Sequence, residues 1–96
     1  MVVDLPSSPP LDDVFYALSD PTRRDIVARA VTGEHSVSAL ARAYPISLTA
    51  VQKHVAVLER AGLVTKSRRG REQIVSTEPR ALAQAHAALD ALEAGW

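Results

Sequence analysis

The polar side chains with the clearest chemical use lie along segment 48–61, which we expect to be a helix. On a helix that turns by about 100° per residue, Val51, Val55 and Leu58 share the face expected to be buried. The outward face consists of Thr49, Gln52, Lys53, Ala56 and Arg60. Hydroxyls, amides and cations in the first turns of a helix suit contact with base edges in the DNA major groove. The sequence therefore predicts a recognition helix, the alternative being an ordinary solvated face.

A basic hairpin follows this helix. Segments 63–66 and 73–77 alternate as strands do, and they are joined through 67–72 with Gly70 at the turn. We expect Arg68, Arg69 and Arg71 to contact phosphates or to enter the minor groove. The alternative is that they protect a sheet edge from aggregation. Three arginines exceed what edge protection needs, so DNA contact is the favoured interpretation.

The distribution of charge supports this interpretation. The chain has eleven basic and eleven acidic residues, yet six of the basic ones lie between positions 53 and 71 beside a single acid, Glu59. A molecule that is neutral overall can still present such a patch to phosphate. We assign DNA contact to Ser47, Leu48, Thr49, Gln52, Lys53, His54, Arg60, Arg68, Arg69 and Arg71.

For three further basic residues the sequence leaves both DNA contact and a structural role open, and for a fourth it predicts only a place in a loop. His54 lies at the border of the buried helix face, where it either donates to a phosphate or holds the turn through a backbone hydrogen bond. Arg23 and Arg24 lie near the positive end of an expected helix, so an intramolecular pair and a phosphate contact are both open. His35 is expected to be a loop residue.

The elements that must position these side chains follow the order helix, helix, helix, helix, β-hairpin, helix. Apolar stripes predict helices over 11–18, from Pro21 to Gly33, over 37–44 and over 48–61, and Pro79 opens the last one. Asp20, Ser36 and Ser47 are the expected N-caps. The tight turn 44–47 gives helix-turn-helix dimensions. The fold class is mainly α with a small β-hairpin: a winged helix-turn-helix in residues 11–96, after a flexible lead-in at 1–10.

The size of the chain indicates a dimer. Ninety-six residues with 4% aromatics form one domain with a thin core, and such domains often complete their buried surface by association. The apolar residues of the first and last helices exceed what one domain covers. The predicted dimer interface consists of Leu11, Val14, Phe15, Leu18, Leu82, Ala85, Leu89, Leu92 and Trp96.

Several function classes are excluded or disfavoured by what the sequence lacks. Without cysteine there is no disulfide, thiolate metal site or cysteine nucleophile. No glycine-rich phosphate loop or helix-borne His-Glu metal motif is present, so we expect neither an enzyme nor a cofactor. No apolar run is long enough for a membrane span, and MVVDLPSSPP at 1–10 is not a secretory signal. The chain is expected to be cytoplasmic and to have no membrane partner.

Three stretches resemble the ArsR/SmtB-type bacterial repressors. They are FYALSDPTRR at 15–24, VSALA at 37–41 and SLTAVQKHVAVLERAGLV at 47–64. The resemblance covers roughly residues 12–79, and the last expected helix agrees with it in position and character. It implies a homodimeric winged-helix repressor whose first and last helices form the dimer interface. It also implies an inverted-repeat operator and a ligand that releases or modulates the repressor.

The resemblance also locates possible metal sites. The family's thiolate site would fall at Ser36 and Ser38, whose hydroxyls are poor ligands for soft metal ions, so a thiolate metal sensor is excluded. A second family site uses carboxylates and imidazoles on the last helix. His86, Asp90 and Glu93 lie there at i, i+4 and i+7, but the usual paired ligands at the helix start are missing. Solvated or interface roles are favoured for these three residues, and no metal is expected.

Two functions remain in view. The first is a sequence-specific DNA-binding regulator, a homodimeric repressor whose partner is a double-stranded operator and whose small-molecule effector, if any, is unidentified. The second is a winged-helix protein-interaction module that never binds DNA. The cations gathered between 53 and 71 favour the first, because an interaction module has no use for them.

Overall fold

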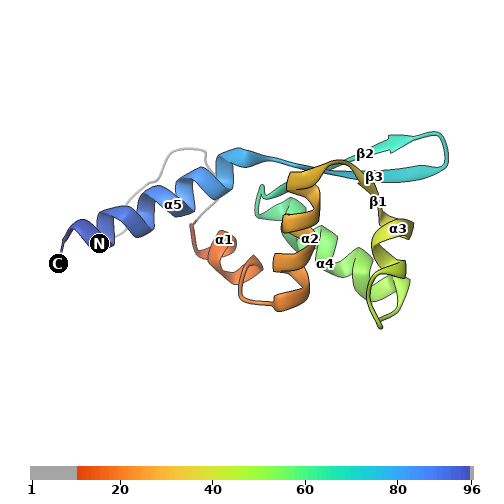
Figure 1. Cartoon of the computed structure of the whole chain (residues 1–96), viewed down its shortest axis with the longest axis horizontal. Helices are drawn as coiled ribbons and strands as arrows, with labels where there is room; N and C mark the ends of the chain where they lie inside the picture. Colours follow the sequence, from red (N-terminus) through yellow and green to blue (C-terminus); the bar gives the residue numbers. More distant parts are fainter. Residues whose placement is uncertain (1–10, 96) are drawn as a thin grey trace.

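The computed structural model describes residues 11–95 as five helices and three short strands (Figure 1). In chain order they are α1 (Leu11–Ala17), α2 (Pro21–Thr32), β1 (His35–Ser36), α3 (Val37–Arg42), α4 (Leu48–Arg60), β2 (Val64–Arg69), β3 (Glu72–Thr77) and α5 (Pro79–Ala94). This is the predicted winged helix-turn-helix, mainly α with a small sheet. The predicted lead-in at 1–10 and Trp96 lie outside the described residues. None of the described helices is long and apolar enough to span a membrane.

The three predicted N-caps are confirmed. The side chain of Asp20 accepts a hydrogen bond from the Arg23 amide at 3.0 Å. Ser36 and Ser47 accept in the same way, at 3.0 Å each, from the amides three residues along. Each cap satisfies an amide that has no partner inside its helix. The starts of α2, α3 and α4 are therefore fixed by local sequence.

One apolar core joins the helices to the hairpin. Its largest fully buried side chains are Val14, Ile26, Leu40, Val51, Val55, Leu58, Leu63, Val64 and Val75. The contribution of α4 is the predicted stripe of Val51, Val55 and Leu58. Because that stripe faces the core, the rotation of α4 about its own axis is fixed, and its polar face must point outward.

The sheet differs from the prediction in two ways. It has three strands in the order β1-β3-β2, because His35 and Ser36 pair antiparallel with Val75 and Ile74. The prediction that His35 is a loop residue was therefore wrong. The hairpin strands are also longer than predicted, with Arg69 opposite Glu72 and only Gly70 and Arg71 in the turn. Gly70 has φ +65°, as the first position of a tight hairpin turn with glycine requires.

A polar contact fixes α3 relative to α2. α3 ends at Arg42 rather than at Tyr44, since the residue before a proline disfavours helical geometry. The Tyr44 hydroxyl donates to Asp25 of α2 at 2.5 Å, and Arg29 donates to the same carboxylate at 2.8 Å. Burial and the bond to Asp25 raise the pKa of Tyr44 to about 12. Tyr44 is therefore a neutral donor that ties the start of the helix-turn-helix turn to α2.

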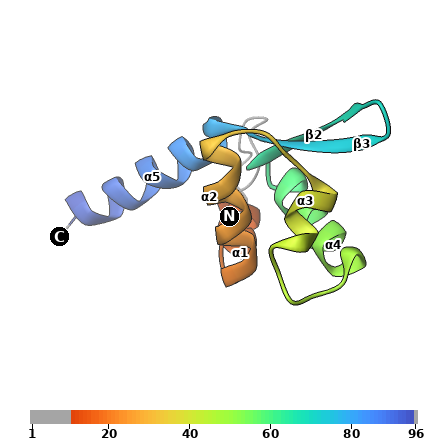
Figure 2. The same cartoon turned by 45° about the vertical axis from the view of Figure 1, so that its right-hand side comes forward.

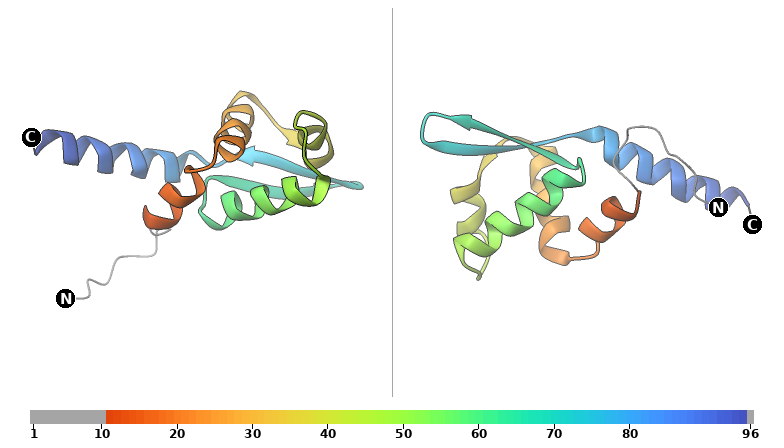
Figure 3. Two further views of the ribbon diagram at one scale, coloured as in Figure 1. Left: turned by 90° about the horizontal axis from the view of Figure 1, so that it is seen from below. Right: turned by 180° about the vertical axis from the view of Figure 1, so that it is seen from behind.

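The last helix extends away from the body of the molecule, at the end opposite the hairpin (Figures 1 and 3). Only its first half packs on the core: Ala81 and Ala85 are buried, and Leu82 packs beside them. Leu89 and Leu92 are 53% and 69% exposed. These two leucines leave an apolar surface on the second half of α5 that no other part of residues 11–95 covers.

Two residues of the predicted dimer interface have to be corrected. Val14 of α1 is fully buried and Ala85 of α5 is 5% exposed, both within the core of a single protomer. They therefore have no surface left to contact a partner. Phe15 is the exposed apolar residue that α1 retains on the predicted stripe.

Candidate nucleic-acid interface

The helix-turn-helix and the hairpin gather at one end of the molecule (Figure 2). α3 and α4 pack together, and α4 also contacts β2 (Figure 3). The polar residues predicted on the outward face of α4 are exposed: Thr49, Gln52, Lys53 and Arg60. Ser47 and Leu48, at the amino-terminal end of the helix, are exposed as well. The structure thus presents hydroxyl, amide and ammonium groups along one accessible helix face.

The register of the hairpin sorts its basic residues between two faces. Lys66 lies opposite the fully buried Val75, and Arg68 lies opposite Gln73, two residues from Val75. Paired residues and alternate positions of a strand share a face, so Lys66 and Arg68 both lie on the face of Val75. Arg69 falls on the opposite face. Sequence reasoning treated the three tip arginines as equivalent, and the register shows that they are not.

Arg69 is held by an acid. Its guanidinium donates to both carboxylate oxygens of Glu34, at 3.0 and 3.1 Å, and Ser76 donates to one of them at 3.4 Å. These hydrogen bonds lower the pKa of Glu34 and raise that of Arg69. Two parallel hydrogen bonds between a guanidinium and a carboxylate fix the orientation of the arginine side chain and also pair its charge. Arg69 therefore joins the hairpin to the segment before β1, and most of its charge is matched.

Four other cations of the interface have no acid beside them. Within residues 11–95, no carboxylate lies within ion-pair distance of Lys53, Arg60, Arg68 or Arg71. Arg68 donates only to the carbonyl of Gly70, at 3.1 Å. Unmatched, exposed cations are the groups that gain most from a nearby phosphate. The charge available to DNA is thus concentrated on α4 and on two of the three hairpin arginines.

Arg23 makes intramolecular contacts, which was one of the two alternatives that the sequence left open. It is only 8% exposed, and its guanidinium donates to the carbonyls of Ala17 at 2.7 Å and Tyr16 at 3.1 Å. Both carbonyls lie at the C-terminal end of α1, where carbonyls have no donor within the helix. The carbonyl of Tyr16 also accepts from the backbone amide of Ser19, at 3.0 Å. Arg24 contacts the carbonyl of Leu18 in the same region, at 2.8 Å, while staying exposed.

His54 belongs to this inner cluster. Its Nδ1 lies 3.3 Å from Nη1 of Arg23 and 4.0 Å from a carboxylate oxygen of Asp20, and its side chain is 22% exposed. Because the guanidinium can only donate, Nδ1 is the acceptor in this contact. His54 therefore has a structural contact through side chains rather than the predicted backbone bond, and its contact with a phosphate stays a prediction. His54 joins α4 to the turn between α1 and α2.

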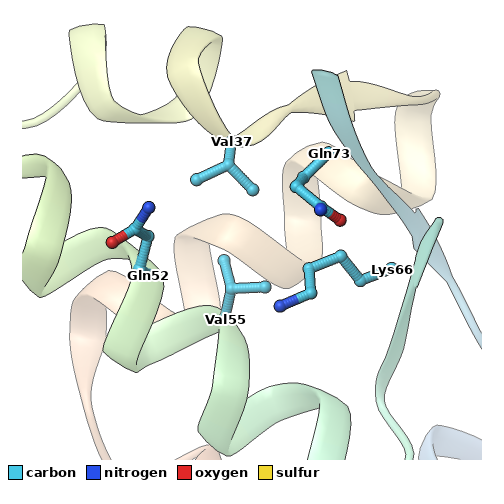
Figure 4. Close-up of a pocket in the computed structure, with 5 residues that line it drawn as sticks. All are labelled: Val37, Gln52, Val55, Lys66 and Gln73. Carbon is cyan, nitrogen blue, oxygen red and sulfur yellow. The ribbon is translucent and has the colours of Figure 1, made fainter. Parts of the chain in front are cut away.

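A small pocket lies between α3, α4 and the hairpin (Figure 4). It has a volume of about 220 Å³ and is lined by Val37, Gln52, Val55, Lys66 and Gln73. Lys66 Nζ is 3.9 Å from a carboxylate oxygen of Glu59. Sequence reasoning missed this site because its lining comes from four elements, α3, α4, β2 and β3, and no spacing within one segment indicates it.

The metal candidates on α5 do not form a site in the part of the chain that the structure describes. His86 Nε2 lies 3.4 Å from Asp90, but both side chains are largely exposed, and no third potential ligand joins them. At the position of the family's thiolate site, the Ser36 hydroxyl is occupied as the cap of α3. A serine hydroxyl does not fit the soft metal ion that a thiolate site holds.

The known proteins that this chain resembles are helix-turn-helix transcriptional regulators. A family model described as a helix-turn-helix domain matches residues 18–67. The chain is 39% identical over 79 residues to the HTH-type transcriptional regulator Rv2034 of Mycobacterium tuberculosis. The matched region covers 82% of this chain and 74% of that protein. The chain is 32% identical over 60 residues to the transcriptional repressor SdpR of Bacillus subtilis, covering 62% of this chain and 67% of that one.

Solved structures agree over most of the chain. The ArsR family transcriptional regulator RHA00566 superimposes with a TM-score of 0.86 at 29% identity, covering 99% of this chain and 96% of that one. The homodimeric winged helix-turn-helix DNA-binding domain of Mb0332 from Mycobacterium bovis has a TM-score of 0.70 at 26% identity, covering 86% and 77%.

Proposed function

Because this chain belongs to the ArsR-type winged helix-turn-helix transcriptional regulators, which are not enzymes, we propose that it is a homodimeric repressor of an inverted-repeat DNA operator. The observation that carries the proposal is the joint exposure of the polar face of α4 and the unmatched hairpin cations at one end of the molecule. The proposed DNA contacts are Ser47, Leu48, Thr49, Gln52, Lys53, Arg60, Arg68 and Arg71.

The two elements have different roles in the complex. The first turns of α4 enter the major groove, where the Gln52 amide suits adenine and Lys53 suits guanine or a phosphate. Arg68 and Arg71 of the hairpin contact backbone phosphates or the minor groove beside it. Contacts of the first kind select the sequence, and those of the second kind set affinity and orientation.

The proposed dimer forms through α1 and α5. Phe15, Leu89 and Leu92 are exposed there, and Leu11, Leu18 and Leu82 are partly exposed beside them. Burying such a face against a second copy is favourable by about 25 cal/mol for each Å² of apolar surface removed from water. The homodimeric state of the Mb0332 domain supports a homodimer here. A two-fold dimer pairs two recognition helices, and its operator is then an inverted repeat.

Repression follows from occupancy of a promoter. The relative SdpR is named a transcriptional repressor, which supports this direction of control. Reading a chromosomal operator requires the protein to share the compartment of the DNA, so we place it in the cytoplasm. The effector, if there is one, is a small molecule rather than a thiophilic metal, because the chain has no cysteine.

Selection from a random duplex pool tests this function. We expect enrichment of an inverted repeat whose half-site centres are about 10–10.5 base pairs, one helical turn, or a multiple of that apart. Enrichment of a single unpaired half-site would overturn the dimeric part of the proposal. No enrichment at low salt would overturn DNA reading itself and favour the protein-interaction module.

A further inference from the structure

The pocket between α3, α4 and the hairpin has a composition that points to a small anion. Its floor is apolar, formed by Val37 and Val55, while Gln52, Lys66 and Gln73 bring polar groups from α4, β2 and β3 (Figure 4). At about 220 Å³ it is smaller than the roughly 300–1,000 Å³ pockets that hold drug-sized ligands. It therefore suits one compact group rather than an extended molecule.

The polar groups of the pocket are available to a ligand. Within residues 11–95, neither the Gln52 nor the Gln73 side chain makes a hydrogen bond to another protein group. The distance of 3.9 Å between Lys66 Nζ and Glu59 is too long for a hydrogen bond, so the three ammonium protons remain free to donate. The ammonium of Lys66 and the amide of Gln73 together form a donor set that suits a phosphate group, and the amide of Gln52 remains available to the bases.

The position of the pocket links it to DNA. Gln52 lies both on its wall and on the outward face of α4, and Lys66 shares a hairpin face with Arg68. A duplex that rests on α4 and on the hairpin has to carry one backbone strand across the gap between them. The pocket is lined by residues of both α4 and the hairpin, so a phosphate bound there lies between them.

We propose that this pocket binds one phosphate group, with Lys66 supplying the charge and Gln73 the amide donor, while Gln52 on the pocket wall contacts the bases. Where the phosphate belongs to the DNA backbone, which is the source we expect, the proposal rests on the proposed function. A free phosphate has the same chemistry and would make the pocket a regulatory site that competes with DNA. The carboxylate of Glu59 repels either form of phosphate, so it lowers the affinity of the site for a phosphate group.

The first arm of the test measures duplex binding by fluorescence anisotropy across a salt series. Loss of one phosphate contact in Lys66→Gln lowers the salt slope by about one and the affinity by roughly eightfold at 0.1 M salt. Glu59→Gln shifts affinity the other way, and Gln73→Ala weakens binding with an unchanged slope. Arg80→Gln, an equal loss of charge at the exposed start of α5, serves as the control and leaves the slope unchanged. Urea unfolding confirms that each variant is folded.

The second arm titrates inorganic phosphate into the protein without DNA and follows the methyl NMR signals of Val37 and Val55. Shifts in the wild type that are absent in Lys66→Gln support the site with a free anion as the source. No shift, together with the lowered slope of Lys66→Gln, supports the DNA backbone as the source. A wild-type slope in Lys66→Gln with no phosphate-induced shift overturns the proposal and leaves DNA binding intact. If the wild type binds no duplex, the proposed function fails, and the phosphate titration alone decides for or against the pocket.

Discussion

The guanidinium of Arg69 donates to both carboxylate oxygens of Glu34, at 3.0 and 3.1 Å, across 35 residues of sequence. This contact lies on the face of the hairpin opposite Lys66 and Arg68. It matches one of the three hairpin arginines, and no carboxylate of residues 11–95 pairs with the other two, Arg68 and Arg71. The contribution of each hairpin arginine to DNA binding therefore depends on strand register rather than on nearness to the tip.

The hairpin arginines are expected to separate in a salt series. Arg68→Ala and Arg71→Ala each lower the salt slope of duplex binding by about one, because each removes one unmatched phosphate contact. Arg69→Ala lowers it less, since Glu34 already matches that charge. Anisotropy titrations of the three variants at several salt concentrations measure this. Equal losses for all three would show that the Glu34 contact opens on DNA.

Arg23 is expected to be a stability residue. Arg23→Met leaves the buried carbonyl of Ala17 without its donor, while the carbonyl of Tyr16 keeps its bonds from Ser19. A buried unsatisfied group costs about 1–3 kcal/mol. Arg24→Met, at an exposed position, is the matched control and is expected to cost well under 1 kcal/mol. The free energy of unfolding in urea checks both values. Equal stabilities of the two variants would contradict the role given to the Arg23 cluster.

The cap of α2 predicts a pH dependence. The hydrogen bond from the Arg23 amide lowers the pKa of Asp20 below its ordinary 3.8. A lowered folded-state pKa stabilises the protein above the unfolded value and loses that stabilisation as the pH falls through the folded value. Asp20→Asn keeps a capping side chain without the charge, so the wild type should be the more stable at pH 7.

The same comparison at acid pH supplies the check. The stability difference between wild type and Asp20→Asn should shrink below pH 3.8, while Asp20→Ala should lose about 1 kcal/mol of cap at any pH. Urea unfolding at several pH values measures all three. A difference that stays constant down to pH 2 would show that the charge of Asp20 contributes nothing.

The dimer face can be tested without touching the core. Leu89→Glu combined with Leu92→Glu places charge on the exposed face of α5 and is expected to produce a monomer at micromolar concentration. Val31→Glu, on an exposed residue of α2, is the matched control and should remain dimeric. Sedimentation velocity distinguishes the states. A wild-type protein that sediments as a monomer would count against the dimer altogether.

The sequence predicted the features that depend on neighbouring residues. The caps at Asp20, Ser36 and Ser47 and the buried stripe of α4 are confirmed, because caps and helical stripes are set within a few positions. The exposed face of α4 follows from the same stripe. These are also the features that make the fold recognisable.

The features that were missed depend on pairing between distant segments. β1 has only two residues, which is too short to show alternation, and it is a strand because β3 pairs with it. Ala85 and Val14 were assigned to the dimer interface because an apolar stripe does not say which part of it the same chain covers. The roles of Arg69 and Lys66 depend on register and on Glu34 and Glu59, which no local pattern indicates.

Binding of the protein to a duplex from upstream of its own gene is the most direct measurement. It is compared with a scrambled duplex of the same composition, by anisotropy across a salt series. Tight binding to the native duplex that weakens steeply with salt, weaker binding to the scrambled one, and loss of that difference in Gln52→Ala are the predicted results. Equal, weak binding to both duplexes, or none at low salt, would contradict sequence-specific recognition by α4.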